Sequence, residues 1–198
     1  MTTQGNPAGM RDAALAPVPF WYLRHGETDW NARDLSQGSV DIPLNANGIA
    51  QAKLAAERLR GLGIVTIVAS PLGRARVTAD YAAAALGLSV AIDDGLREVA
   101  FGEQEGKPMG TWYDSWIAGE YTPEGAEVFA DLRSRAIAAL NRVTALPAPV
   151  LVVAHGGLFR AIRSAMGLEP NVRTANAVPI LCRPPGAGAT AWTLEPHT

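Results

Sequence analysis

The stretch Val150-Leu151-Val152-Val153-Ala154-His155-Gly156-Gly157 does most to decide the fold. Its aliphatic run predicts a buried strand, and the two glycines after the histidine predict a turn that leads directly into a helix over 156–166. A second aliphatic run, Val18 to Leu23, ends at Arg24-His25-Gly26. If the two strands are parallel neighbours, both histidines lie at the same edge of the sheet.

The wider pattern alternates short strands with helices. Aliphatic, β-branched and aromatic runs bounded by turn residues predict strands over 18–23, 64–69, 89–92, 150–154, 178–182 and 191–194. Amphipathic or alanine-rich segments, the first two preceded by the candidate N-caps Asn45 and Ser70, predict helices over 46–60, 71–86, 126–145 and 156–166. This alternation predicts the α/β class, as a doubly wound three-layer α/β/α sandwich with a mostly parallel central sheet.

Composition and length indicate one ordinary globular domain. The chain has 198 residues, of which 48% are apolar and 18% charged, and its formal net charge is -2. We expect a flexible N-terminal lead-in over 1–17, rich in Gly, Ala, Pro and Thr, followed by a single domain over 18–198. The balanced charge argues against a nucleic-acid partner, and no apolar run approaches the roughly 20 residues that cross a bilayer.

The number of cysteines indicates the cellular compartment in which the protein works. Cys182 is the only cysteine, which excludes an internal disulfide and fits a reducing environment. The first residues also lack the basic start and long apolar run of a signal peptide. We therefore expect a cytoplasmic protein that acts on a small molecule, and the sequence leaves open whether it forms a homodimer.

The first histidine string suits nucleophilic chemistry on phosphorus. A neutral imidazole can carry a phosphoryl group as a covalent intermediate, so His25 is the candidate nucleophile. Arg24 offers a planar fork of donors for phosphate oxygens, and Gly26 allows the backbone to approach a bound group. The alternative for a histidine taken alone is a structural imidazole bonded to a backbone carbonyl.

Two further residues are candidates for binding the same anion. Arg74 is expected in the first turn of its helix, where a cation opposes the helix dipole and is better explained by a bound anion than by helix stability. His155 precedes the helix over 156–166, so we expect it to donate to a transferring phosphoryl group. For Arg74 the alternative is a solvated surface charge.

Phosphoryl transfer to a histidine also needs a proton donor for the leaving alkoxide. Glu98 follows the third expected strand and is the candidate general acid. Glu105 belongs to the same loop and competes for this role. The residues do not decide between the two glutamates, and either could be a solvated surface group.

Five motifs follow one another along the chain. They are Arg24-His25-Gly26-Glu27-Thr28 with Trp30-Asn31, Gln37-Gly38 with Asp41-Ile42-Pro43-Leu44, Ser70-Pro71-Leu72 with Arg74-Ala75, Glu98 with Phe101-Gly102, and His155-Gly156-Gly157. In this order they resemble the histidine phosphatase superfamily, also called the phosphoglycerate mutase-like family, over roughly residues 18–182. The resemblance implies a phosphohistidine at His25, an acid at Glu98, and a phosphate pocket built from Arg24, Asn31, Arg74 and His155. It also implies that Gln37 and Gly38 line the pocket.

The chain departs from the family pattern in two places. Gln104-Glu105-Gly106 stands where many members have Trp-Glu-Gly, and Gly125-Ala126-Glu127 stands where many have Gly-Glu-Ser. Between these departures, the aromatic-rich segment 107–125 is either a lid that selects substrates or a small aromatic core. Its aromatic residues are Trp112, Tyr113, Trp116 and Tyr121.

Within the family the choice is between hydrolysis and mutase transfer. Lys107 is the only cation between Gly102 and Pro123, which leaves little there to hold a second phosphate. We therefore favour a phosphoric monoester hydrolase of the histidine acid type over a phosphoglycerate mutase, and over a non-catalytic phosphate-binding domain. Histidines beside arginines make a poor cation cage, so we expect neither a metal nor another cofactor.

Overall fold

A six-stranded sheet forms the centre of the protein. The computed structural model describes residues 14–186 and 188–198. The strand order is β3-β2-β4-β1-β5-β6, in which the first four are parallel and the last two antiparallel to their neighbours. The strands are β1 (Phe20–Arg24), β2 (Thr66–Ala69), β3 (Val90–Ile92), β4 (Val150–Ala154), β5 (Ile180–Arg183) and β6 (Thr193–Pro196). The predicted α/β class with a mostly parallel sheet is confirmed.

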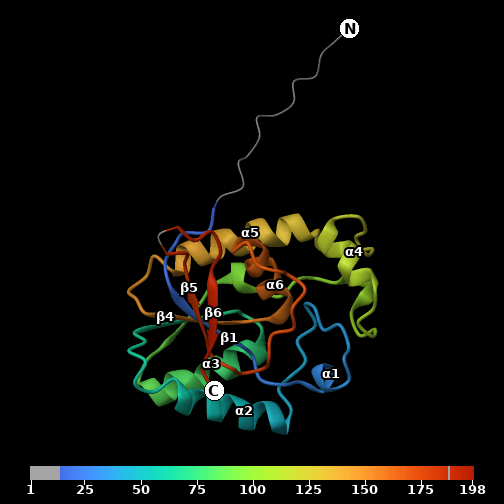
Figure 1. The fold of residues 1–198 in the computed structure, drawn as a ribbon. Coiled ribbons are helices and arrows are strands. Elements are labelled where there is room, and N and C mark those ends of the chain that lie inside the picture. Colours follow the sequence, from blue (N-terminus) through green and yellow to red (C-terminus); the bar gives the residue numbers. More distant parts are fainter. Residues whose placement is uncertain (1–13, 187) are drawn as a thin grey trace.

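Helices cover both faces of this sheet (Figure 1). They are α1 (Asp29–Ala32), α2 (Ala46–Arg58), α3 (Gly73–Leu86), α4 (Trp112–Ala118), α5 (Phe129–Val143) and α6 (Gly156–Ala165), with 3-10 turns η1 (Asp94–Leu96) and η2 (Gly102–Gln104). The helices α2 and α3 cover one face, and α5 and α6 cover the other. This is the predicted three-layer sandwich.

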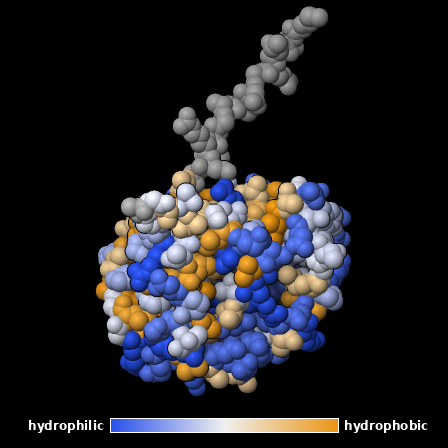
Figure 2. Space-filling model, viewed as in Figure 1, coloured by the Kyte–Doolittle hydropathy of each residue, from blue (hydrophilic) through white to orange (hydrophobic). Residues whose placement is uncertain are grey.

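Alternation along the central strands explains why both faces are buried. In β1, Trp21 and Leu23 pack with α2 and α3, whereas Phe20 and Tyr22 pack with α5 and α6. Successive side chains of a strand point to opposite faces, so an uninterrupted apolar run is what a doubly covered strand requires. On the outside, the face shown in Figure 2 has hydrophobic residues interspersed with hydrophilic ones.

The carboxyl ends of β1 and β4 lie side by side. Arg24 is the register partner of Ala154, and the amide of His25 donates to the Ala154 carbonyl at 3.0 Å. The amide of Ser70, just after β2, donates to the Val153 carbonyl at 3.0 Å. Both histidines therefore follow neighbouring parallel strands, at the edge where ligands of open α/β sheets bind.

One predicted helix cap is confirmed and the other is wrong. The Asn45 side chain accepts from Gly48 N at 2.8 Å and caps α2. Helix α3 begins only at Gly73, with Leu72 as an N-cap that makes no side-chain bond. Ser70 is not its N-cap: its Oγ accepts from Leu72 N at 3.3 Å, before α3 begins, and lies 2.6 Å from Nε2 of His155.

The aromatic segment 107–125 contributes to the main core. Tyr113 and Trp116 of α4 are buried against Phe101 and Phe129, and Trp116 Nε1 donates to the Glu127 carbonyl at 2.9 Å. Tyr121 is exposed. Of the two interpretations of this segment, the structure favours the aromatic core.

Part of the predicted N-terminal lead-in lies outside the described residues, namely 1–13. Next to it, Ala16 N donates to Oδ1 of Asn141 on α5 at 2.8 Å, and Leu15 packs against the core. Among the described residues, none of the helices is both long and apolar enough to cross a membrane.

The core interpretation of the aromatic segment predicts a large stability effect at Trp116. Its side chain is 0% exposed, so Trp116→Ala should lower the free energy of unfolding by about 3–5 kcal/mol in urea denaturation. Tyr121→Ala is the matched control, because Tyr121 is 40% exposed, and should change it by less than about 0.5 kcal/mol. Equal effects would contradict the core interpretation.

Candidate active site

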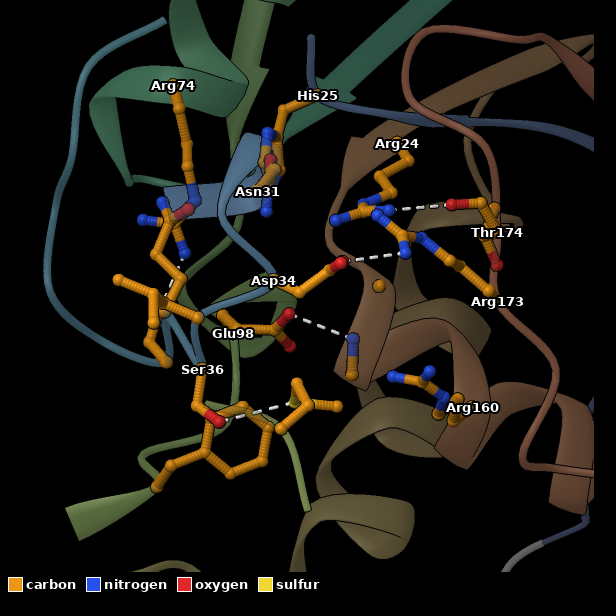
Figure 3. Close-up of a pocket in the computed structure, with 17 residues that line it drawn as sticks. Arg24, His25, Asn31, Asp34, Ser36, Arg74, Glu98, Arg160, Arg173 and Thr174 are labelled. Carbon is orange, nitrogen blue, oxygen red and sulfur yellow. Dashed lines mark hydrogen bonds and ion pairs between the residues drawn. The ribbon is translucent and has the colours of Figure 1, made fainter. Parts of the chain in front are cut away.

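A cavity of about 390 Å³ opens at the carboxyl edge of the parallel strands (Figure 3). Seven of the predicted site residues line it: Arg24, His25, Asn31, Gln37, Gly38, Arg74 and Glu98. The eighth, His155, lies directly behind, with its ring centroid 5.3 Å from that of His25. The structure thus brings together residues that are more than 100 positions apart in the chain.

His25 is held as a neutral imidazole with one free nitrogen. Its Nδ1 lies 2.7 Å from the Gly26 carbonyl, which selects the tautomer with the proton on Nδ1 and leaves the lone pair on Nε2. Burial lowers the pKa of His25 well below its usual range, and the cations Arg74 and Arg24 lower it further. A nucleophile needs this unprotonated nitrogen.

Gly26 is required by packing against α2. A Cβ at this position would lie 2.3 Å from the carbonyl oxygen of Gly48 in α2. Packing against a helix of the protein itself is thus a reason for this glycine that the sequence did not indicate, and the predicted approach to a bound group stays a prediction.

His155 is positioned from two sides. Its Nε2 lies 2.6 Å from the Ser70 hydroxyl, while Tyr22 Oη donates to its carbonyl at 2.7 Å and accepts from its amide at 3.1 Å. Within the described residues Nδ1 is buried without a partner. Burial lowers the pKa of His155 well below its usual range, and Arg74 adds to this effect. Sequence reasoning missed both Ser70 and Tyr22 as supports for His155.

Arg24 enters the cavity with part of its guanidinium unpaired. Nη1 donates to the Thr174 carbonyl at 2.7 Å, whereas Nε is buried without an acceptor in the part of the chain described. Gly156 leaves room for this side chain, since a Cβ there would lie 3.2 Å from Nε of Arg24. The arginine keeps donors available for an anion.

Arg74 organises the loop that forms the opposite wall. It is buried, and it donates to the carbonyls of Gly38 and Val40 at 2.8 Å each. In the amide orientation of Gln37 that satisfies its neighbours, Oε1 accepts from Arg74 Nε at 2.9 Å and Nε2 donates to Thr28 Oγ1 at 2.6 Å. These hydrogen bonds to loop carbonyls partly explain why a cation lies in the first turn of α3.

Glu98 reaches the cavity because it caps α6. Its Oε2 accepts from Gly157 N at 2.8 Å, and Oε1 accepts from Leu158 N at 2.7 Å. The N-terminus of α6, which we expected to favour a bound phosphate, is therefore occupied by a side-chain carboxylate. Glu105 does not join the residues that line the cavity, because it accepts from Ser39 N at 2.7 Å.

Asn31 is oriented by neighbouring polar groups. Its Oδ1 accepts from Thr28 N at 3.3 Å and from Asn176 Nδ2 at 3.2 Å, and Asn176 also donates to the His25 carbonyl at 2.9 Å. The side-chain nitrogen of Asn31 thereby remains available to donate to a ligand in the cavity.

Two cationic residues of the cavity were missed by sequence reasoning. They are Arg160, one turn into α6, and Arg173, in the segment between α6 and β5. Both lie outside the stretch between Gly102 and Pro123, where Lys107 is the only cation. The helical spacing of Gly156 and Arg160, which places both on one face of α6, was the available signal for Arg160.

Comparison with known proteins agrees with this geometry. The model of the Histidine phosphatase superfamily (branch 1) matches residues 20–178, and the chain belongs to this family of phosphatases and mutases. It is 41% identical over 167 residues to the probable phosphoglycerate mutase GpmB of Yersinia enterocolitica, covering 78% of this chain and 77% of that protein.

Solved structures share the fold. Mycobacterial glucosyl-3-phosphoglycerate phosphatase Rv2419c, in complex with VO3, is 29% identical with a TM-score of 0.78, covering 89% of this chain and 97% of the other. TTHB049 from Thermus thermophilus is 30% identical with a TM-score of 0.69, covering 82% of this chain and 92% of the other. The protein is thus an enzyme of the histidine phosphatase superfamily, a phosphatase or a mutase.

The buried histidines predict that stability falls in mild acid. Because the pKa values of His25 and His155 are lowered in the folded state, the unfolded chain binds protons below its ordinary histidine pKa of 6.5 while the folded chain does not. The free energy of unfolding should be flat above about pH 7 and fall below it by up to about 1.4 kcal/mol per pH unit for each histidine.

Urea denaturation between pH 5 and 8 measures this slope. His25→Gln and His155→Gln should each flatten it, whereas His197→Gln, at an exposed position, should not. An unchanged slope in both buried-site variants would refute the assignment of neutral buried histidines.

Proposed function

We propose that the protein hydrolyses small-molecule phosphomonoesters through a phosphohistidine on His25. The observation that carries this proposal is a buried imidazole whose Nδ1 lies 2.7 Å from the Gly26 carbonyl and which lines one cavity with Arg24 and Arg74. The family membership supports a phosphoryl-transfer reaction, and the cavity volume of about 390 Å³ suits a small substrate.

In the first step, Nε2 of His25 attacks phosphorus and the bond to the leaving oxygen breaks. Arg24, Arg74 and the Asn31 amide bind the phosphoryl oxygens, and His155 donates through Nδ1 if the Ser70 hydroxyl donates to its Nε2. Glu98 protonates the leaving oxygen, so the products are an alcohol and the phosphohistidine. This division of roles is that of a phosphatase of the histidine acid type.

In the second step, water attacks the phosphohistidine. Glu98 now accepts a proton from the attacking water, the bond between Nε2 and phosphorus breaks, and inorganic phosphate leaves. His25 is regenerated as the neutral imidazole.

Mutase transfer is the second candidate, and one observation favours it. Arg160 and Arg173 supply cations beyond the stretch between Gly102 and Pro123, so a substrate with two anionic groups has partners in the cavity. A mutase returns the phosphoryl group to a second hydroxyl instead of to water. The two reactions differ only in the acceptor.

Replacing the nucleophile tests the shared first step. His25→Ala should lower kcat for p-nitrophenyl phosphate about 10⁴-fold or more, because no covalent intermediate can form. His197→Ala, at an exposed position, is the matched control and should retain activity. Retained turnover in His25→Ala, or strong inhibition of the unmodified enzyme by a chelator, would count against the mechanism. Comparing phosphate release with isomerisation of 3-phosphoglycerate then separates phosphatase from mutase.

The acid is tested by the leaving group. Glu98→Gln should lower kcat more than about 100-fold for alkyl phosphates but less than about tenfold for p-nitrophenyl phosphate, whose leaving group needs no proton. Glu105→Gln, in the same loop but bonded to Ser39, should show no such difference. Similar losses on both substrates in Glu98→Gln would assign the proton to another group.

A further inference from the structure

Helix α2 binds the segment of chain that follows His25. Oε1 of Gln51 accepts from the Glu27 amide at 2.9 Å, and the Asn45 amide donates to the Glu27 carbonyl at 3.0 Å. A Cβ at Gly48 would lie 2.0 Å from the Glu27 carbonyl oxygen, so the backbone of α2 approaches this segment as closely as a glycine allows. The proposed phosphoryl transfer gives these residues of α2 no task.

The peptide group between Gly26 and Glu27 connects α2 to the nucleophile. Its carbonyl oxygen, that of Gly26, lies 2.7 Å from Nδ1 of His25. Its N–H, that of Glu27, donates to the side chain of Gln51. A trans peptide group is planar, and its N–H and C=O point in opposite directions. Gln51 and His25 therefore bind the two ends of one dipole.

The preceding peptide group is fixed from two other parts of the fold. The Gly26 amide donates to Thr78 Oγ1 of α3 at 3.0 Å, and Asn176 Nδ2 donates to the His25 carbonyl at 2.9 Å. The segment is thus held on both sides of Gly26. Within it, Gln51 is the side chain that acts on the peptide group whose carbonyl faces the imidazole.

Attack on phosphorus makes the His25 ring positive. The lone pair of Nε2 forms the bond to phosphorus, the bond from phosphorus to the leaving oxygen breaks with its electron pair, and the proton on Nδ1 stays in place. The charge spreads over the ring, so the hydrogen bond from Nδ1 to the Gly26 carbonyl strengthens in the transition state. Consecutive hydrogen bonds polarise one another, so an acceptor at Gln51 increases the negative charge on that carbonyl oxygen.

We propose that Gln51 is a positioning residue for the nucleophile. Its side-chain oxygen orients and polarises the Gly26 carbonyl, which keeps the His25 proton on Nδ1 and stabilises the ring charge as the phosphohistidine forms. Gln51 is not one of the described residues that line the cavity, so it acts through His25 and not on the substrate. The inference rests on the proposed function, because it concerns the first step of the same transfer.

The kinetic test replaces the acceptor by a side chain of similar length. Gln51→Met should lower the rate of p-nitrophenol release about tenfold in a single turnover, with enzyme in excess over p-nitrophenyl phosphate. Gln51→Glu keeps an oxygen acceptor and should stay within about threefold of the unmodified enzyme. The enzyme concentration that gives half of the maximal rate should change less than about twofold in either variant, because substrate binding is not affected.

A spectroscopic measurement reports the His25 tautomer without turnover. In the nitrogen NMR spectrum of isotope-labelled histidine rings, the neutral His25 ring of the unmodified protein should give two well-separated resonances, from a protonated Nδ1 and an unprotonated Nε2. In Gln51→Met the two resonances should move toward each other, because the other tautomer becomes populated. Their loss in His25→Gln identifies them.

Asn47→Leu is the matched control. Asn47 is exposed one turn before Gln51 on α2, and its Nδ2 donates to the Glu27 side chain at 3.0 Å but not to the peptide group. This variant should keep both the single-turnover rate and the two resonances. Near-ultraviolet circular dichroism checks that each variant is folded. If Gln51→Met does not fold, Gln51→Ala replaces it with the same expected results.

A single-turnover rate in Gln51→Met within about twofold of the unmodified enzyme overturns the proposal. A loss in Gln51→Glu or in Asn47→Leu as large as that in Gln51→Met overturns it too, because the effect then does not depend on the acceptor oxygen.

The proposed function and the role of Gln51 fail separately. If the unmodified enzyme releases no p-nitrophenol, the proposed function fails, while a changed tautomer in Gln51→Met still supports the positioning of His25 by Gln51. If turnover proceeds through the phosphohistidine but Gln51→Met changes neither the rate nor the tautomer, the role of Gln51 fails and the proposed function stands.

Discussion

The parallel pairing of β1 with β4 is the constraint on which the rest of the structure depends. It places Arg24 opposite Ala154 and lets the His25 amide bond to the Ala154 carbonyl, so the two histidine rings lie 5.3 Å apart. A slip of one residue would turn Tyr22 toward α2 and Leu23 toward α5, exchanging the side chains of two buried faces. The apolar alternation that builds the core therefore also sets the distance between the histidines.

Around these histidines, positive charge is held largely by uncharged groups, and the carboxylate of Asp41 lies 3.6 Å from Nη1 of Arg74. Arg24 bonds to the carbonyl of Thr174, and Arg74 bonds to the carbonyls of Gly38 and Val40. Carbonyl dipoles satisfy donors that burial would otherwise leave unpaired, yet they leave the net charge available to an anion. Glu98, which lines the same cavity, is in turn bonded to the N-terminus of α6.

Much of the fold could be predicted because its signals are local. Strand β4 has the predicted bounds, and Asn45 caps α2 as its sequence position indicates. Ser70 looks like an equally good cap, but α3 begins only at Gly73, and the Ser70 hydroxyl meets a histidine 85 residues away. The local sequence pattern cannot show which of two possible hydrogen-bond partners a hydroxyl group contacts in the folded chain.

The same limit applies to the candidate site. Residues at strand ends, such as His25 and Arg24, could be predicted because the sheet topology gathers them. Glu98 and Glu105 could not be separated from sequence, since only the packing of α6 shows which carboxylate meets its free amides. Arg173 lies in an irregular segment that no periodicity connects to the cavity.

One feature of the core reaches beyond stability. Tyr113 packs with Phe101 and Trp116 and at the same time supports Arg160, while Phe101 also lines the cavity. The aromatic core and the cavity wall are thus one continuous body of packed rings. Within the described chain, Trp116 and Phe129 do not line the cavity. A change of side-chain volume at either position would nevertheless move the cavity wall that these rings support. Substitutions in the buried aromatic core can therefore change which ligand the cavity prefers, even though the substituted residues do not contact the ligand.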